Sequence, residues 1–253
     1  MPLCASETRL EVLRRCLAPR PAAVSARLEL RPQCQPAQAA GVAGAETAAA
    51  IGVHPTADAA LALQQLAQHG FCILNAVIPA ADVTALRASA ERTAVEHDKG
   101  TGRPAHDVVG VFHVTGVLNY DQTIGQWLGH PRVMEVIEAA FATDQIRVSH
   151  TTLQVNTPGC KQQEWHADNG LSQPKQWEVA PGEMLRRPAH INTLWMLSDF
   201  TPENGATWLV PASHRRPGSE TPNAAWSAEA TLKPYHEAIH AAAPAGSVLL
   251  IAI

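Results

Sequence analysis

A histidine and an aspartate two residues apart are the residues of this chain best suited to bind a metal ion. They are His166 and Asp168, in the run WHADNG at residues 165–170. Side chains two apart on a β-strand project from the same face, so this imidazole and this carboxylate can reach one divalent ion. Together with a second, distant histidine, such a pair forms the facial triad that binds non-haem iron(II) and leaves positions open for substrate and oxygen. Because His-x-Asp also occurs often by chance, the alternative is a surface turn with a solvated Asp168.

A second candidate metal site lies near the end of the chain. The run from His236 to His240 fits the His-Glu-x-x-His pattern of zinc hydrolases, with Glu237 as the residue that activates water. That chemistry needs a helix, which brings both histidines to one face, and a third ligand downstream. Pro234 and Pro244 bracket the run, and the residues after His240 contain no histidine, aspartate or glutamate. We therefore keep a zinc hydrolase only as a remote alternative.

Composition narrows the class of partner. The chain has 253 residues, of which 46% are hydrophobic, so it can bury the core of one large domain. Its formal net charge of -4 gives no basic surface for nucleic acid, and it has no apolar run of about 18 residues to span a membrane. Its five cysteines are widely spaced and include no Cys-x-x-Cys pair, which is typical of reduced thiols in a cytoplasmic protein. We expect the partner to be a small molecule.

The first 55 residues differ in character from the rest. Arginines are scattered among alanines and prolines, and residues 41–50 form a low-complexity run of small residues. Such a composition builds a core poorly and predicts a disordered leader. A short basic helix at residues 8–17 leaves an organellar transit peptide as the alternative, although nearby glutamates count against it. We therefore expect a leader over residues 1–55, one domain over 56–253, and a cytoplasmic location unless the leader is a targeting peptide.

From Thr56 onward the chain shows regular helix and strand patterns. Helices are predicted where apolar residues recur with the helical period, and strands where apolar and β-branched residues cluster between turn signals. The predicted helices cover residues 56–70, 82–96, 124–128 and 131–141, and the predicted strands cover residues 71–74, 108–117, 148–155, 191–197 and 246–251. This order predicts a mainly β fold, a sandwich or jelly roll with flanking helices packed on one outer face.

Two local signals refine this prediction. Thr56 is the expected cap of the first helix, and Gly70 its end. Thr201–Gly205 contains an Asn-Gly pair, which between two apolar runs is a strong signal for a β-hairpin. We therefore expect residues 206–210 to return alongside residues 191–197 as the second arm of a hairpin.

Six short motifs follow one another along the chain. They are Gly70-Phe71, Pro158-Gly159, Trp165 to Asp168, Trp195 with Asp199 to Ala206, Pro211 to Arg215, and Ala245 to Leu250. In this order they resemble the phytanoyl-CoA dioxygenase family of iron(II)- and 2-oxoglutarate-dependent oxygenases. The resemblance implies a double-stranded β-helix, the cupin-like jelly roll, with His166 and Asp168 as iron ligands. It also implies that Gln163 or Trp195 lies near 2-oxoglutarate, which is converted to succinate while the substrate is oxidised.

The given sequence ends before two features of this family's pattern. The second metal histidine and the arginine that binds the far carboxylate of 2-oxoglutarate would follow the strand at 246–251, and the sequence stops at Ile253. We therefore expect a jelly roll without its last strands, exposed strand edges that favour self-association, and weak or absent catalysis by this chain alone. His214 lies in a matched motif, but the resemblance gives it no metal role, so we expect a turn histidine with a local hydrogen bond.

Three functions follow from these patterns. The first is a non-haem iron(II)- and 2-oxoglutarate-dependent dioxygenase that oxidises a small organic substrate. The second is a non-catalytic jelly-roll module that binds a ligand or partner, and the third is the zinc hydrolase. Binding of iron(II) and of 2-oxoglutarate separates the first two, because only the dioxygenase needs both.

Overall fold

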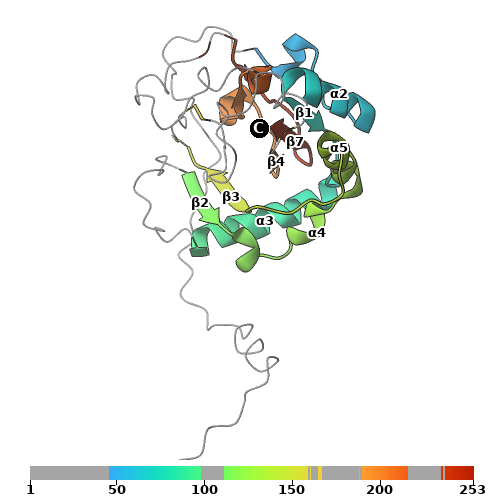
Figure 1. The fold of residues 1–253 in the computed structure, drawn as a ribbon. Helices are drawn as coiled ribbons and strands as arrows, with labels where there is room; N and C mark the ends of the chain where they lie inside the picture. Colours follow the sequence, from blue (N-terminus) through green and yellow to red (C-terminus); the bar gives the residue numbers. More distant parts are fainter. Residues whose placement is uncertain are drawn as a thin grey trace, which may run out of the picture. The chain divides into compact units, whose positions relative to one another are not determined.

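The structure of the chain is a computed structural model that describes residues 46–97, 111–158, 160, 165–166, 188, 190–215, 235 and 237–253. Four α-helices lie in these ranges: α2 (Ala59–His69), α3 (Ala80–His97), α4 (Gly125–Leu128) and α5 (Pro131–Phe141). The strands are β1 (Phe71–Leu74), β2 (Val111–Thr115), β3 (Thr152–Asn156), β4 (Ile191–Trp195), β5 (Trp208–Leu209), β6 (Ile239–His240) and β7 (Val248–Ala252) (Figure 1). Short 3-10 helices are η1 (Ala48–Ile51), η2 (Val117–Asn119), η5 (Pro202–Asn204) and η6 (Ser213–Arg215). None of the described helices is both long and apolar enough to cross a membrane.

The central element is a three-stranded antiparallel sheet in the order β1-β7-β4. The last strand of the chain is its middle strand, with Leu250 opposite Cys72 on one side and Thr193 on the other. All of β7 except Ile251 is buried, as its run of apolar residues requires of a strand covered on both faces. Within the described ranges β1 and β4 are therefore the edges of this sheet, and self-association through such edges stays a prediction.

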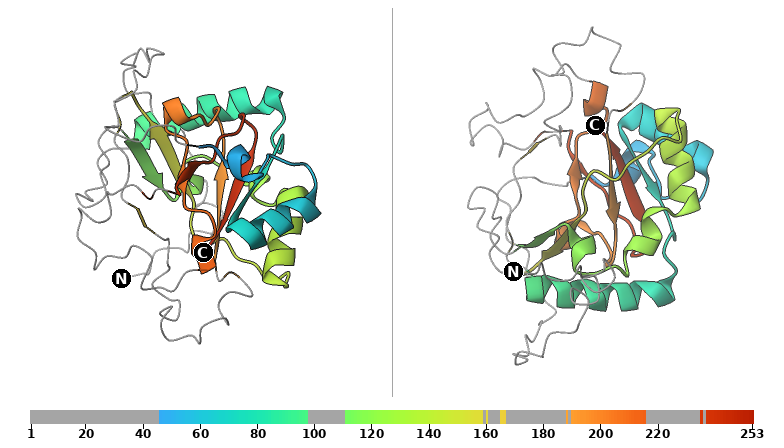
Figure 2. Two further views of the ribbon diagram at one scale, coloured as in Figure 1. Left: turned by 90° about the horizontal axis from the view of Figure 1, so that it is seen from above. Right: turned by 60° about the horizontal axis from the view of Figure 1, so that its bottom comes forward.

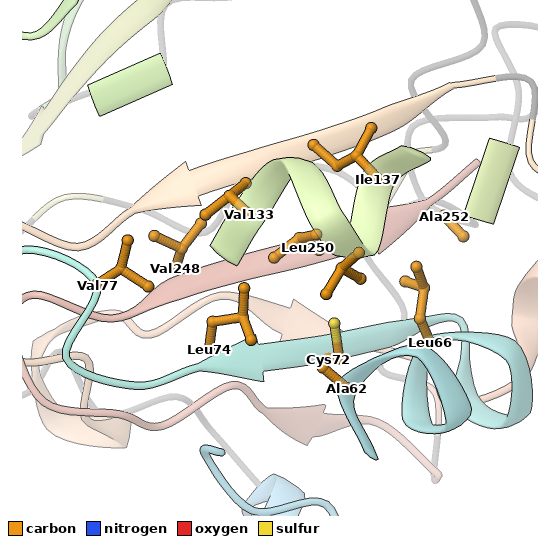
Figure 3. Close-up of a cluster of buried hydrophobic side chains, with 11 residues drawn as sticks. Ala62, Leu66, Cys72, Leu74, Val77, Val133, Ile137, Val248, Leu250 and Ala252 are labelled. Carbon is orange, nitrogen blue, oxygen red and sulfur yellow. The ribbon is translucent and has the colours of Figure 1, made fainter. Parts of the chain in front are cut away.

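Helices α2 and α5 cover one face of this sheet (Figures 1 and 2). Val248 and Leu250 of β7 pack there against Leu66 of α2 and Val133 of α5 (Figure 3). Each such side chain gains roughly 1.5–3 kcal/mol from leaving water. The expected packing of helices on one outer face of the sheet is confirmed for α2 and α5, whereas α3 packs on the sheet of β2 and β3.

The opposite face of the same sheet is covered by the small sheet of β5 and β6. Alternate residues of β7 and β1, such as Leu249 and Ile73, form a second cluster with Ile239 of β6. Ala48 and Val53, which precede the expected start of the domain at Thr56, are also buried in this cluster. Residues near the end of the expected leader therefore contribute to the core, and the boundary at residue 55 stays a prediction.

A third layer forms where α3 packs on the two-stranded sheet of β2 and β3. Ala90 and Ala94 of α3 contact Val114 and Leu153, which lie directly opposite each other in the β2–β3 ladder. Strand β3 begins at Thr152, although a strand was expected from residue 148, because Val148 is 63% exposed and has no core to join. Residues 108–110 of the other expected strand lie outside the described ranges.

The expected hairpin around Asn204-Gly205 is wrong. Strand β4 pairs with β7, and β5 pairs with β6. Between them, Pro202 begins the 3-10 helix η5, and Asn204 forms a capping box with Thr201. The tight hairpin turn needs positive φ at two successive residues, whereas in this turn only Gly205 has it, at 88°. The Asn-Gly pair therefore ends a short helix and sends β5 to a different sheet.

The residue that caps the start of α2 differs from the expected one, whereas the residue that ends the helix is as expected. Asp58 caps the helix, because its carboxylate accepts hydrogen bonds from Ala60 and Leu61 at 2.8 and 3.2 Å. Thr56 instead accepts a hydrogen bond from the main chain of Asp58. Gly70 ends the helix in the left-handed region, at φ 82°, as expected.

Candidate metal centre

The structure describes the histidine of the candidate pair but not its partner. His166 lies in the segment that follows β3, and its side chain is exposed. Asp168 and Gln163 lie outside the described residues, so their places at a metal or cosubstrate site remain predictions. The described part of the WHADNG run therefore consists of Trp165 and His166.

The residue before His166 is held by aromatic contacts from two distant segments. The ring of Trp165 lies edge-on to Tyr235, with centroids 5.2 Å apart and an interplanar angle of 80°. It makes a similar contact with Trp208 of β5, at 6.3 Å and 64°. Trp208 in turn lies against the ring of His240, with centroids 3.8 Å apart. We call Trp165, Trp208, Tyr235 and His240 the aromatic cluster.

Strand pairing explains why this cluster forms. Trp208 and His240 lie directly opposite each other in the β5–β6 ladder, so their side chains share one face. Their neighbours Leu209 and Ile239 project from the other face into the core. His240 is 5% exposed, and its Nδ1–H donates to the carbonyl of Ala206 at 3.0 Å. Sequence reasoning missed the cluster, because nothing local marks Trp208 and His240 as cross-strand partners.

The same observation removes the zinc hydrolase. The zinc pattern places two histidines one helical turn apart, but Ile239 and His240 form strand β6 and Glu237 lies in the turn before it. The Nδ1 of His240 is occupied by Ala206, and its ring packs against Trp208. His236 lies outside the described residues. The His-Glu-x-x-His match is therefore a strand and its turn rather than a zinc-binding helix.

His214 anchors one motif to the end of a helix. It lies in η6, and its ring nitrogen Nε2 is hydrogen-bonded to the carbonyl of Ala67 in α2 at 3.3 Å. Arg215 donates to the next carbonyl, that of Gln68. The partners are distant in sequence, so the expected local hydrogen bond is wrong. Burial lowers the pKa of His214, with Arg215 and His69 also lowering it, against the hydrogen bond to Ala67. The ring N–H of His214 satisfies a carbonyl that has no partner within the last turn of α2.

Comparison with known proteins decides the family. The family model described as phytanoyl-CoA dioxygenase (PhyH) matches residues 66–253. The chain belongs to the phytanoyl-CoA dioxygenase family. Members of this family are iron(II)- and 2-oxoglutarate-dependent dioxygenases that act on small molecules.

One curated relative and one solved structure define the similarity further. Dioxygenase af480 of Aspergillus fumigatus is 26% identical over 157 residues, which are 59% of this chain and 47% of that protein. The chain thus spans about half the length of this curated relative. The non-heme alpha ketoglutarate dependent carbocyclase SnoK, from nogalamycin biosynthesis, matches with a TM-score of 0.55 and 19% identity over 79% of this chain and 77% of that chain. This match shows the fold, which is the double-stranded β-helix of 2-oxoglutarate oxygenases. The residues that the structure describes contribute small antiparallel sheets with helices to it.

Trp195, the described candidate for the 2-oxoglutarate site, lies at the end of β4. It packs against two buried clusters, one that includes Val133 of α5 and one that includes Leu86 of α3, and its Nε1–H donates to Thr193 at 3.1 Å. Leu194, the preceding residue, projects to the opposite face and joins the second cluster. Trp195 is thus on the helix-covered face of the sheet, and its part in cosubstrate binding stays a prediction.

The described donors suit iron(II) in chemistry but do not complete a site. Imidazole nitrogen is a ligand that iron accepts readily, and His166 carries an imidazole on an exposed side chain next to Trp165 of the aromatic cluster. Among the residues that the structure describes, no three histidines, cysteines or carboxylates are grouped to hold a metal ion. The imidazole of His166 therefore fits one ligand position by its chemistry, and the roles of His166 and Asp168 as metal ligands stay predictions.

Proposed function

We propose that this chain is part of a non-haem iron(II)- and 2-oxoglutarate-dependent dioxygenase that oxidises a small organic substrate. The observation that carries the proposal is the family match over residues 66–253, which includes the whole His-x-Asp run. The position of His166 supports it, because an exposed imidazole follows a β-strand and is flanked by an anchored tryptophan. The non-catalytic jelly-roll module is the alternative that the experiments below must separate.

Each proposed residue has one task. His166 and Asp168 would hold iron(II) through an imidazole nitrogen and a carboxylate oxygen. Gln163 and Trp195 would lie near 2-oxoglutarate. When bound, iron(II) and 2-oxoglutarate would activate dioxygen, which is the oxidant: one of its oxygen atoms would go to oxidising the substrate and the other into succinate, with release of carbon dioxide. The protein's part is to orient both groups and to keep an open place for the substrate.

Metal binding is the first test. Anaerobic titration calorimetry of the full chain with iron(II) should show a site whose affinity falls at least about tenfold in both His166→Ala and Asp168→Ala. His97→Ala is the matched control, since His97 is the last residue of α3 and its ring stacks on Tyr120 and lies 3.9 Å from the Glu96 carboxylate. Equal iron(II) affinity in the wild type, both site variants and the control would contradict the proposed ligands.

Cosubstrate chemistry is the second test. Conversion of 2-oxoglutarate to succinate by the wild-type chain, followed by mass spectrometry with iron(II) present, should be weak, and it should be lost in His166→Ala. Trp195→Phe should raise the KM for 2-oxoglutarate if Trp195 contacts it, and should lower only the free energy of unfolding if the ring serves packing. A chain that binds iron(II) but neither binds nor converts 2-oxoglutarate would be the non-catalytic module instead.

A further inference from the structure

Trp165 connects the candidate metal ligand to the core of the fold. We propose that Trp165 is a positioning residue, which fixes the main chain at His166 through the edge-to-face contacts of its ring with Tyr235 and Trp208. This inference rests on the proposed function, since it assigns to Trp165 the task of aiming the His166 imidazole at iron(II). Its evidence is separate, because it comes from the aromatic cluster and not from the family match.

The anchor acts on the main chain at His166. The His166 side chain is exposed, so the position of its main chain sets where the imidazole can reach. His166 lies in irregular backbone, where no strand ladder holds the main chain. A metal ligand has to be held within about 0.5 Å of its productive position by its surroundings. The Cα atoms of Trp165 and His166 are only about 3.8 Å apart, so fixing the first residue restrains the second.

The anchor itself is joined to the core by several contacts. Trp208 packs on His240, which is 5% exposed and hydrogen-bonded through its ring to Ala206. The main-chain N–H of His240 also donates to the carbonyl of Glu46 at 3.0 Å. On the other face of the same ladder Ile239 is buried in the core. A tryptophan that packs on this ladder is therefore tied to the centre of the fold.

The contacts of Trp165 are apolar and depend on the relative orientation of the rings. Its Nε1 is buried and has no hydrogen-bond partner among the described residues. Aromatic pairs prefer the edge-to-face arrangement seen here, with centroids between about 4.5 and 7 Å. Phenylalanine can reproduce such contacts and removes the buried N–H, whereas alanine removes the ring. Trp165→Phe should thus preserve the position of His166, and Trp165→Ala should lose it.

The experiment uses the full chain and cobalt(II) as a spectroscopic probe for the iron site. Trp165→Ala and Trp208→Leu should bind cobalt(II) at least about tenfold more weakly and change its visible d–d absorption. Trp165→Phe should keep the wild-type affinity and spectrum. Tyr120→Leu is the matched control, because it removes a ring stacked on a histidine at 4.1 Å that lies in a different part of the fold.

A metal-free measurement makes the test independent of loading. Hydrogen exchange of the His166 amide in the apoprotein should become about tenfold faster in Trp165→Ala and stay unchanged in Trp165→Phe, at a free energy of unfolding matched by urea. Wild-type exchange, affinity and spectrum in Trp165→Ala would overturn the positioning role while leaving the proposed function intact. Failure of the wild type to bind cobalt(II), or equal binding by His166→Ala, would instead overturn the proposed ligand and the positioning role with it.

Discussion

The carboxylate of Asp199 accepts a hydrogen bond of 2.8 Å from the main-chain N–H of Ala245, 46 residues further along the chain. The carbonyl of Asp199 also accepts a hydrogen bond from the side chain of Asn204. The first contact joins the turn after β4 to the residues that lead into β7, and the second holds that turn together. Since β4 and β7 are neighbours in the central sheet, the contacts fix the end of the ladder on which the fold is built.

Removing the Asp199 carboxylate should therefore loosen this end of the sheet. We expect Asp199→Ala to lower the free energy of unfolding by about 1 kcal/mol, because the hydrogen bond is charge-assisted but partly exposed to water. Asp199→Asn keeps an acceptor oxygen and should cost less than half as much. Urea denaturation of the three proteins measures the difference, and an Asp199→Ala variant as stable as the wild type would show that water replaces the contact.

Two glycines give a matched test of strain against steric contact. Both have positive φ, at 84° for Gly246 and 76° for Gly52. A Cβ on Gly246 would lie 2.4 Å from the carbonyl oxygen of Ile78, whereas a Cβ on Gly52 would meet nothing within 4 Å. We expect Gly52→Ala to cost about 1 kcal/mol of stability from backbone strain alone. Gly246→Ala should cost about 3 kcal/mol or more, because a backbone oxygen cannot move aside cheaply. Equal losses in thermal unfolding would contradict this.

Asp121 should make stability depend on acid pH. It is 6% exposed; burial, the largest single effect, raises the pKa of Asp121, but hydrogen bonds from Thr123, Ser89 and Thr93 outweigh burial and hold the pKa below its ordinary value of 3.8. A carboxyl group whose pKa is lower in the folded than in the unfolded state stabilises the folded protein at pH values above its unfolded-state pKa. This stabilisation is lost as the pH falls through the folded-state pKa. We expect Asp121→Asn to cost about 1–3 kcal/mol at pH 7.

The pH dependence of this difference is the decisive measurement. In urea titrations the gap between wild type and Asp121→Asn should be constant above pH 5 and shrink below pH 3.8. Asp144→Asn, at an exposed position, should change the free energy of unfolding by no more than about 0.5 kcal/mol. A gap between wild type and Asp121→Asn that stays constant down to pH 2 would show that the Asp121 carboxylate is not held by these hydrogen bonds.

Cys72 should be chemically inert in the folded protein. It is fully buried in β1, and burial raises the pKa of its thiol to about 12. Because the thiolate is the reactive form, iodoacetamide at pH 8 should modify Cys72 only when the chain unfolds. Mass spectrometry across a urea series should then show labelling that follows the unfolding transition. Labelling in native buffer at the rate of an exposed thiol would mean that β1 opens locally.

Local sequence signals determined much of the helical part. Pro131 at the first position of α5 and Gly70 at the end of α2 act within a few residues, and both elements were predicted at these boundaries. The buried strand Phe71–Leu74 was also predicted, since four apolar residues follow a helix-ending glycine. The cap of α2 was misassigned to Thr56 because two residues of suitable type, Thr56 and Asp58, stand two apart, and only the backbone decides which of them binds the helix N–H groups.

For the candidate site too, one part could be predicted from the sequence and another part could not. The spacing of His166 and Asp168 and the order of the six motifs can be read directly from the sequence, and together they indicate the family that the comparison shows. What the sequence could not indicate is what holds Trp165, because its partners Trp208 and Tyr235 stand far along the chain and meet it only in three dimensions. The residues of a strand do not by themselves show which strand it pairs with. Strand β5 has only two residues and pairs with β6 rather than with β4. The burial of Leu209 and Ile239 in a shared core explains this pairing, whereas the Asn-Gly turn before β5 does not.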